Sequence, residues 1–389
     1  MTFPTTSPMT ATSSSLGLDL VDEQGKTFTD LTAGQASCLG HRHPAVCKAI
    51  QVACETHLGA AVDRLAADWH HDLGESFATF DRCALSGSAN DANELALRWA
   101  RAALGRERYR VITLLGSDHG DTFMLRSASG RTEVQGYDGP VAAGFRHVRP
   151  AKLDAIAKAI DAQTAAICLS PVDWNQGGET FETEYLLGIE ALCREHDLLL
   201  MLDETRIPTG VGGAWFFHQR ANVSPDIVTA SAGWTGGLPG GLTLVSARVS
   251  DRFAALNADE QAWLWPPNKD LPLLRHVMAA TALVVEEEQW LDRLPETADT
   301  WAAMLEEAVA GFDFVRGCGS AGLWTTINFD LPAADVVAGA RAAGLCVEAT
   351  GDTTVLICPP VNVTGDTLFE AIHKLRNALE AIERVTASL

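Results

Sequence analysis

The chain has 389 residues, a formal net charge of −21 and an isoelectric point near 4.8. Because nucleic acids and anionic membranes are themselves negatively charged, this charge argues against both as partners. No apolar run is long enough to span a bilayer. The content of 47% apolar and 20% charged residues is typical of a soluble globular protein.

The predicted elements begin with two short strands within residues 18–32, separated by a turn at residues 22–25. The Ser-, Thr- and Pro-rich residues 1–15 that precede them are expected to form a flexible arm. A helix is predicted from Pro44 to about His57, because proline suits a first helical turn. Strands then alternate with helices, which is the pattern of a parallel α/β sheet.

The alternation of strands and helices ends near Pro266, and the residues before this point are predicted to form a large domain. We predict strands at residues 110–115, 165–169, 198–202, 226–230 and 242–246, with helices at 152–162 and 184–196. Beyond Pro266 we predict helices at 273–288, 294–310, 333–343 and 366–382, and strands at 323–329 and 354–358. The expected fold class is therefore α/β, with a large, mainly parallel sheet domain over residues 45–270. A smaller α+β domain would combine residues 1–44 and 271–389.

The nine cysteines are scattered, and none of them forms a CxxC pair. Most fall in apolar strands or helices, and their total is odd. We therefore predict buried free thiols in a reducing cytoplasm, rather than disulfides or a metal site.

Several short motifs follow one another along the chain. They are Leu39–Pro44, Ser86–Glu94, Ser117–Thr122, Asp203–Glu204, Gly213–Phe216 and Pro225–Ile227. Their joint order and spacing resembles the class III (omega-type) aminotransferases of pyridoxal phosphate (PLP) fold type I, over about residues 18–379. The resemblance implies PLP fold type I and, since the family's sites lie between subunits, a homodimer.

The resemblance also implies a cofactor site. It assigns the cofactor phosphate to the helix start at Ser88, Ala89 and Asn90, whose free N–H groups and dipole favour an anion. The same residues are equally suited to be an N-cap. Asp203, with Glu204 beside it, ends a buried strand and would hold the pyridine nitrogen.

One position departs from the family in a way that changes the chemistry. Ala232 stands where the family has the lysine that forms the Schiff base with PLP. Asp118 replaces the aromatic residue that stacks on the ring, and His119 after it is either a donor or base in the pocket or a structural histidine. We expect Glu204 to pair with a cation such as Arg206.

Three explanations of Ala232 stay open: a laboratory Lys-to-Ala change in an ordinary aminotransferase or aminomutase, natural divergence, or a catalytically silent binding or assembly subunit. Several independent losses around one cofactor favour divergence. We therefore expect an aminotransferase-fold enzyme that does not transaminate, with PLP or its amine form PMP absent or weakly bound. The predicted catalytic residues Asp118, His119 and Asp203 would perform acid–base chemistry, such as isomerisation, cyclisation, dehydration or condensation.

The residues that replace the cofactor contacts predict a pocket for a small amine-bearing or aromatic metabolite. Carboxylates beside aromatic rings suit a cationic or aromatic ligand, although about half of these rings are expected to pack in the core or at a dimer contact. The predicted pocket residues are Asp173, Trp174, Arg206, Trp234, Trp263 and Trp265.

Overall fold

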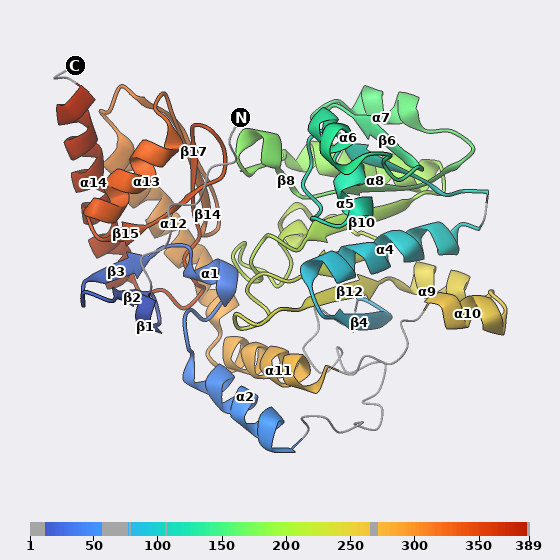
Figure 1. Cartoon of the computed structure of the whole chain (residues 1–389), viewed down its shortest axis with the longest axis horizontal. Helices are drawn as coiled ribbons and strands as arrows, with labels where there is room; N and C mark the ends of the chain where they lie inside the picture. The colour runs from blue at the N-terminus through green and yellow to red at the C-terminus, as the bar shows by residue number, and fades with distance from the viewer. Residues whose placement is uncertain (1–11, 57–76, 78, 106, 265–270, 387–389) are drawn as a thin grey trace.

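The computed structural model describes residues 12–56, 77, 79–105, 107–264 and 271–386 (Figure 1). Its largest element is a seven-stranded sheet, the central sheet, in the order β4-β12-β11-β10-β7-β5-β6. Its strands are β4 (Arg82–Ser86), β5 (Arg110–Leu114), β6 (Phe145–Val148), β7 (Thr164–Leu169), β10 (Leu199–Glu204), β11 (Ile227–Ala230) and β12 (Gly241–Val245). The pairs from β11 to β6 are parallel, whereas β12 runs antiparallel to both of its neighbours.

Helices cover both faces of the central sheet (Figure 1). Alternate strand residues point to opposite faces, so Cys168 and Met201 belong to one core cluster while Ile167 and Leu200 belong to another. This burial on both sides explains the continuous apolar runs of these strands. The first face carries α4 (Ala89–Ala103), α5 (Phe123–Ala128), α9 (Ala247–Ala254) and α10 (Ala258–Leu264), and the second carries α7 (Leu153–Ala159) and α8 (Thr183–Glu195). A short helix, α6 (Thr132–Asp138), follows α5.

Two four-stranded sheets complete the fold. The N-terminal sheet has the order β1 (Thr12–Leu16), β2 (Asp19–Asp22), β3 (Thr27–Asp30) and β15 (Leu345–Cys346). The C-terminal sheet has the order β13 (Val315–Ala321), β14 (Trp324–Phe329), β17 (Thr354–Ile357) and β16 (Glu348–Ala349). Because β15 pairs with β3, the two ends of the chain form one sheet.

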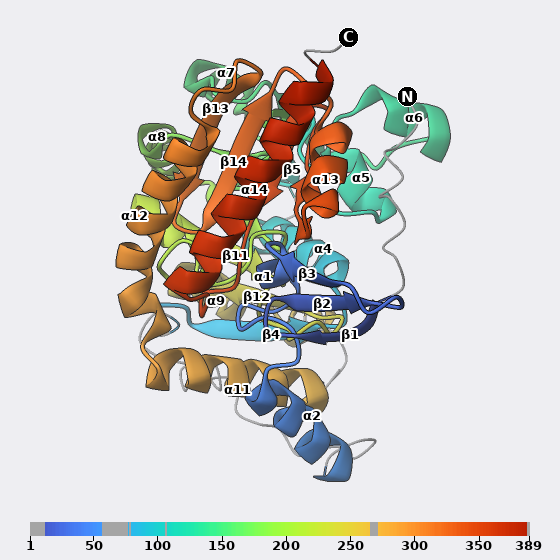
Figure 2. The same ribbon diagram turned by 90° about the vertical axis from the view of Figure 1, so that its left-hand side faces the viewer.

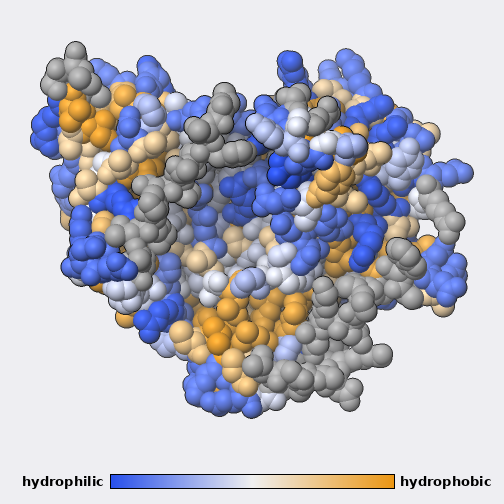
Figure 3. Space-filling view, viewed as in Figure 1, coloured by the Kyte–Doolittle hydropathy of each residue, from blue (hydrophilic) through white to orange (hydrophobic). Residues whose placement is uncertain are grey.

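The remaining helices lie around these two sheets. Figure 2 shows α14 in front of β14, with α12 on its left and α13 on its right, while α11 and α2 contact each other below them. Figure 3 shows a mostly hydrophilic face with an apolar patch at the place that α11 occupies in Figure 1. These helices are α1 (Ala33–Ala36), α2 (Pro44–Thr56), α11 (Pro272–Glu287), α12 (Trp290–Val309), α13 (Ala333–Ala342) and α14 (Gly365–Thr386).

A small hairpin joins the central and C-terminal sheets. It consists of β8 (Val172–Asp173), the 3-10 turn η2 (Trp174–Gln176) and β9 (Glu179–Thr180). The Trp324 indole N–H donates to the Gly178 carbonyl at 2.8 Å, and the Thr350 hydroxyl donates to the Gly177 carbonyl at 2.6 Å. Gly177 has a φ of +67°, and a Cβ there would lie 2.4 Å from Thr354. Glycine is therefore required where the hairpin meets the C-terminal sheet.

Most of the predicted elements are confirmed within one to four residues at their ends. Residues 12–16 form β1 rather than part of a flexible arm, and residues 1–11 lie outside the described part. The strands β4, β6 and β13 were not predicted, and α12 begins at Trp290, before the predicted Leu294. Pro295 lies inside α12 at its sixth residue, where it removes one N–H from the helical hydrogen bonds. The division into domains at residues 45 and 270 stays a prediction.

The cysteines are all free, as predicted, but only some are buried. Cys38, Cys83, Cys168, Cys193 and Cys358 are buried, whereas Cys47, Cys54 and Cys318 are exposed and Cys346 is intermediate. Within the described residues, no cluster of His, Cys, Asp and Glu is arranged to hold a metal ion. In the same part of the chain, no helix combines the length and apolarity needed to cross a membrane.

Candidate active site

The candidate site lies at the carboxyl edge of the central sheet, where parallel strands end together. Asp203 is near the end of β10 and pairs in register with Thr229 of β11. Asn93 reaches this edge from α4, and His119 reaches it from the loop that follows β5. Residues far apart in the sequence therefore meet around one carboxylate.

The Asp203 carboxylate is 3% exposed and is surrounded by donors. Its Oδ1 accepts from the Thr205 backbone N–H at 3.0 Å and from the Thr205 hydroxyl at 2.6 Å. Its Oδ2 accepts from Asn93 Nδ2 at 2.9 Å and from His119 Nδ1 at 2.8 Å. An ionised carboxylate offers about four acceptor sites, so these groups satisfy it. Thr229 completes the network by donating its hydroxyl to Asn93 Oδ1 at 2.6 Å.

His119 is engaged through both ring nitrogens. Nδ1 bonds to Asp203, and Nε2 lies 4.0 Å from the Cys168 thiol of β7. Burial alone lowers the pKa of His119, but Cys168 and the bond to Asp203 outweigh it and hold the pKa well above 6.5. Of the two roles considered for His119, the structure favours the structural one, because the imidazole fixes Asp203 and is itself buried.

The raised pKa of His119 predicts a pH dependence of stability. The protonated ring stabilises the folded state fully below about pH 6.5, and this stabilisation is lost as the pH rises through the folded-state pKa. We expect the free energy of unfolding of the unaltered chain to fall, relative to His119→Asn, as the pH rises from about 6.5 through the folded-state pKa of His119. Urea denaturation of both proteins across a pH series measures this difference. Parallel curves for the two proteins would contradict the assignment.

Ala232 lies beside the segment that continues from Asp203. Its backbone N–H donates to the Thr205 carbonyl at 3.0 Å, and its carbonyl accepts from the Thr209 N–H at 3.0 Å. Main-chain bonds on both sides thus fix position 232 against the segment that follows Asp203. The methyl side chain offers neither a nucleophile nor a titratable proton.

The lysines of the described residues belong to other elements. Lys374 of α14 donates to the Thr29 hydroxyl at 2.8 Å, and Lys26 lies in the turn before β3. Lys48 is on α2, Lys152 caps the start of α7 and Lys158 lies within α7. Lys269 lies outside the described residues. Among the described residues, the segments that meet at Asp203 therefore carry no lysine.

The helix start at residues 88–90 is an N-cap, as the plain interpretation of its residues predicted. Ser88 Oγ accepts from the Asp91 backbone N–H at 3.0 Å, and Asn90 Oδ1 accepts from the Asp121 N–H at 3.2 Å. Ala89 is the first residue of α4. Asp91 adds a carboxylate to this first turn. A role of the same turn in binding a phosphate stays a prediction.

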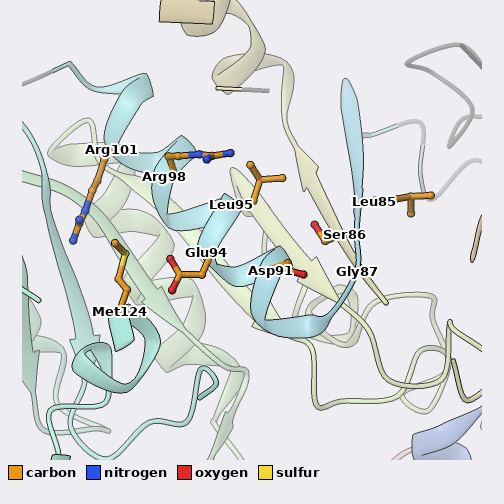
Figure 4. Close-up of a pocket in the computed structure, with 9 residues that line it drawn as sticks. All are labelled: Leu85, Ser86, Gly87, Asp91, Glu94, Leu95, Arg98, Arg101 and Met124. Carbon is orange, nitrogen blue, oxygen red and sulfur yellow. The ribbon is translucent and has the colours of Figure 1, made fainter. Parts of the chain in front are cut away.

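A separate pocket of about 340 Å³ runs along α4 (Figure 4). Ser86, Gly87 and Asp91 line it near the helix start, and Arg98 and Arg101 line it farther along the helix (Figure 4). The buried carboxylate network is not part of its wall.

Asp118 and Arg206 form an ion pair at the same edge of the sheet. Arg206 Nη1 donates to Asp118 Oδ2 at 2.6 Å, and the guanidinium lies 3.9 Å from the centre of the Trp174 ring. The prediction that Glu204 pairs with Arg206 is therefore wrong. Glu204 Oε1 instead lies 2.8 Å from His218 Nδ1, and this buried pair is reinforced by two backbone N–H groups of the following 3-10 turn.

The other predicted pocket residues have different positions. Asp173 Oδ1 accepts from the Asn175 backbone N–H at 2.9 Å and caps η2. Trp234 is 0% exposed and stacks on Trp215 at 4.9 Å, so it belongs to the core and does not line a pocket. For Trp263 only the backbone in α10 is described, and Trp265 lies outside the described residues. Trp174 is the predicted tryptophan that contacts the ion pair.

Sequence reasoning missed four partners of the network, namely Asn93, Thr205, Thr229 and Cys168. Asn93 had a detectable signal, because this amide sits among Ala92, Leu95 and Ala96 on the apolar face of α4. A buried amide on such a face requires hydrogen-bond partners. Nothing in the sequence indicated that Cys168 would face an imidazole.

Comparison with known proteins places this geometry in context. A family model described as aminotransferase class-III matches residues 4–379. The acetylornithine aminotransferase of Bacillus subtilis (strain 168) is 31% identical over 381 residues, covering 93% of each chain. That of Halalkalibacterium halodurans is 30% identical over 389 residues, covering 97% of each.

Solved structures agree on the fold. The ornithine aminotransferase of Toxoplasma gondii ME49 superimposes with a TM-score of 0.86 at 22% identity, covering 96% of this chain and 91% of that one. The N-acetylornithine aminotransferase of Stenotrophomonas maltophilia K279a gives a TM-score of 0.80 at 23% identity, covering 97% of each. The prediction of an α/β PLP fold type I with a large, mainly parallel sheet is confirmed.

Proposed function

Because the chain belongs to the class-III aminotransferase family, we propose that its site is arranged for amino-group transfer on a small amine-bearing metabolite. Ala232 lacks the amine that would bind the cofactor covalently, so this step is blocked. The relatives are acetylornithine and ornithine aminotransferases. They support the interpretation of this chain as an ordinary aminotransferase in which alanine has replaced the lysine at position 232. They give no support to a lysine-less enzyme of another reaction class. The observation that carries the proposal is the hydrogen-bond network around Asp203, whose member Thr205 is bonded through its backbone to position 232.

Two positions of the site suit PLP, and two, Ala232 and Asp118, depart from what the family's cofactor site requires. Asp203 would face the pyridine nitrogen, and the N–H groups at the start of α4 would hold the phosphate. The amine that should hold the cofactor covalently is replaced by the methyl group of Ala232. When bound, the cofactor supplies an electron sink for bonds at the amine-bearing carbon.

The chain's own residues supply orientation and charge. Asn93 and Thr205 fix the Asp203 carboxylate in one orientation, and His119 holds a proton on Nδ1 toward Oδ2. The low exposure of this set strengthens its electrostatic effect, because water is excluded. Without an amine at position 232, however, no residue of the described network can move a proton at the substrate carbon in the way a lysine would.

The decisive test is Ala232→Lys. We expect the variant incubated with PLP to retain the cofactor covalently after borohydride reduction, as an added mass in the intact protein. We also expect it to transfer the amino group of ornithine or acetylornithine to a 2-oxo acid. Ala254→Lys, at an exposed position of α9, is the matched control and should do neither. A folded Ala232→Lys protein that retains no cofactor would overturn the proposal.

One observation favours a second candidate, an enzyme that performs acid–base chemistry without transamination. The ion pair of Asp118 with Arg206, stacked on Trp174, is not a change that a single lysine replacement would bring. Turnover of a metabolite by the unaltered chain, together with no covalent cofactor in Ala232→Lys, would establish this alternative.

A silent binding or assembly subunit is a third outcome of the same experiments. In that case, Asp118→Ala should leave the biological role unchanged. The homodimer, the small-molecule substrate and the cytoplasmic location stay predictions.

A further inference from the structure

A groove of about 250 Å³ lies between the β8–β9 hairpin and one face of the C-terminal sheet. Glu179 of β9 lines one side, and Gly317 and Gly319 of β13 with Thr326 and Asn328 of β14 line the other. Gly319 pairs in register with Thr326, and Gly317 pairs with Asn328, so these four residues share one face of the sheet. The described lining of this groove has no residue in common with the buried carboxylate network.

The groove exists because two alternate residues of β13 have no side chain. A Cβ at Gly317 would meet no atom within 4 Å, and one at Gly319 would lie 3.9 Å from Thr326 Oγ1. Neither residue has the positive φ that would require glycine. The bulge of β13 lies between Val315 and Gly317, so it does not account for Gly319. A glycine inside a strand weakens the strand and often marks a place where a ligand approaches the backbone.

The polar groups of the groove present two unused oxygens. Thr354 donates its hydroxyl to Asn328 Oδ1 at 2.7 Å, which leaves Asn328 Nδ2 to donate to Glu179 Oε1. This chain of bonds fixes the Glu179 carboxylate, whose Oε2 has no partner among the described residues. Thr326 is 4% exposed, and its hydroxyl makes no hydrogen bond within the described part of the chain. Both oxygens are therefore available to a donor that enters the groove.

The charge of the groove selects a cation. Among its described lining residues, Glu179 is the one that is ionised at neutral pH. Arg316, which precedes Gly317, is paired with Asp330. The described residues contain no cluster arranged to hold a metal ion, so the chemistry favours an organic cation. The net charge of −21 would also draw cations to the surface.

The hydrogen bonds distinguish between two kinds of organic cation. A guanidinium binds a carboxylate best through two parallel bonds, one to each oxygen. Asn328 already occupies one oxygen of Glu179, so this arrangement is blocked. A primary ammonium has three N–H donors around one atom, and these can be shared between Glu179 Oε2 and Thr326 Oγ1.

We propose that this groove binds a small primary alkylammonium, which donates to Glu179 Oε2 and Thr326 Oγ1 while its alkyl chain packs against Trp324 in the wall. The volume is below the usual range of ligand pockets, so the alkyl chain must be short. The groove is a second site, and the inference does not rest on amino-group transfer at Asp203.

Calorimetric titration of the unaltered chain at about pH 7.5 tests the inference with three probes that share a butyl chain: butylamine, 1-butanol and N,N,N-trimethylbutylammonium. Butylamine is protonated at this pH. It should bind about tenfold more tightly than the alcohol, which has no charge, and than the quaternary ion, which has no N–H group. Equal binding of the quaternary ion would overturn the hydrogen bonds to Glu179 and Thr326. No detectable binding of butylamine would overturn the whole inference.

Substitutions in the groove assign the binding to these residues. Glu179→Gln should weaken butylamine binding about tenfold. Gly319→Val should abolish it, because the new side chain occupies the groove beside Thr326, and valine suits an exposed strand. Glu182→Gln, at an exposed carboxylate outside the groove, is the matched control and should bind butylamine as the unaltered chain does. Thermal unfolding shows that each variant folds, and undiminished binding by a folded Gly319→Val protein would contradict the inference.

Asp118→Asn separates the groove from the candidate active site. This variant should bind butylamine with unchanged affinity. Weakened binding in Asp118→Asn together with full binding in Glu179→Gln would place the ammonium at the edge of the central sheet and overturn the inference. An inactive Ala232→Lys protein would refute the proposed function and leave the groove unaffected, so the two failures can be told apart.

Discussion

Asp203→Ala is expected to lower the free energy of unfolding by about 3–5 kcal/mol. The substitution removes the shared acceptor of the Thr205, Asn93 and His119 donors in a site that is 3% exposed. The protonated imidazole would then be buried without its carboxylate, which is the costliest of these losses. Denaturant unfolding measures the change as a lower midpoint with an unchanged slope.

Asp118→Ala is the matched control for this prediction. Asp118 is also a carboxylate paired with a cation at the same sheet edge, but its side chain is 40% exposed. An exposed pair contributes about 0–1 kcal/mol, so the control should change stability little. Similar losses for the two variants would show that the network around Asp203 is not what holds this edge together.

Trp324→Ala is expected to cost about 3–5 kcal/mol, because a fully buried ring of this size leaves a cavity that the core fills only partly. Trp324 is 1% exposed and packs edge-on against Trp174 and Phe217. Its indole N–H also donates to the Gly178 carbonyl. The loss would thus combine packing with an unmet buried acceptor, and denaturant unfolding would record both.

Trp324→Phe separates these two contributions. Phenylalanine keeps most of the buried ring but cannot donate to Gly178, so the expected loss is about 1–3 kcal/mol. A Phe variant as unstable as the Ala variant would mean that the hydrogen bond, and not the ring, is the main link between the hairpin and the C-terminal sheet.

The sequence predicted the central part of the fold well, for a physical reason. The strands β7, β10 and β11 are buried on both faces, so their residues form uninterrupted apolar runs that are easy to recognise. β13 was missed because its residues are mostly exposed and include Gly317 and Gly319, so it lacks both an apolar run and a clear alternation. β1 was missed because its serines suggested a disordered arm.

Asp203, at the centre of the candidate site, was predicted from the sequence, but most of its hydrogen-bond partners were not. Asp203 could be recognised because a carboxylate ends an apolar strand, which is costly without a compensating contact. The partner of Glu204 could not be recognised, since Arg206 is near it in sequence whereas His218 becomes its neighbour through a turn. Trp234 was misplaced for a related reason: closeness to position 232 along the chain did not reveal that its side chain points into the aromatic core.

The hairpin between β8 and β9 has a mechanical consequence. Trp324 and Thr350 of the C-terminal sheet region donate to its two glycine carbonyls, while Asn175 in its turn donates to the Leu115 carbonyl that follows β5 of the central sheet. Arg206 lies in the loop that follows β10 of the central sheet. A tilt of one sheet against the other would therefore break one of these two sets of hydrogen bonds and disturb the contact of Trp174 with the Arg206 guanidinium.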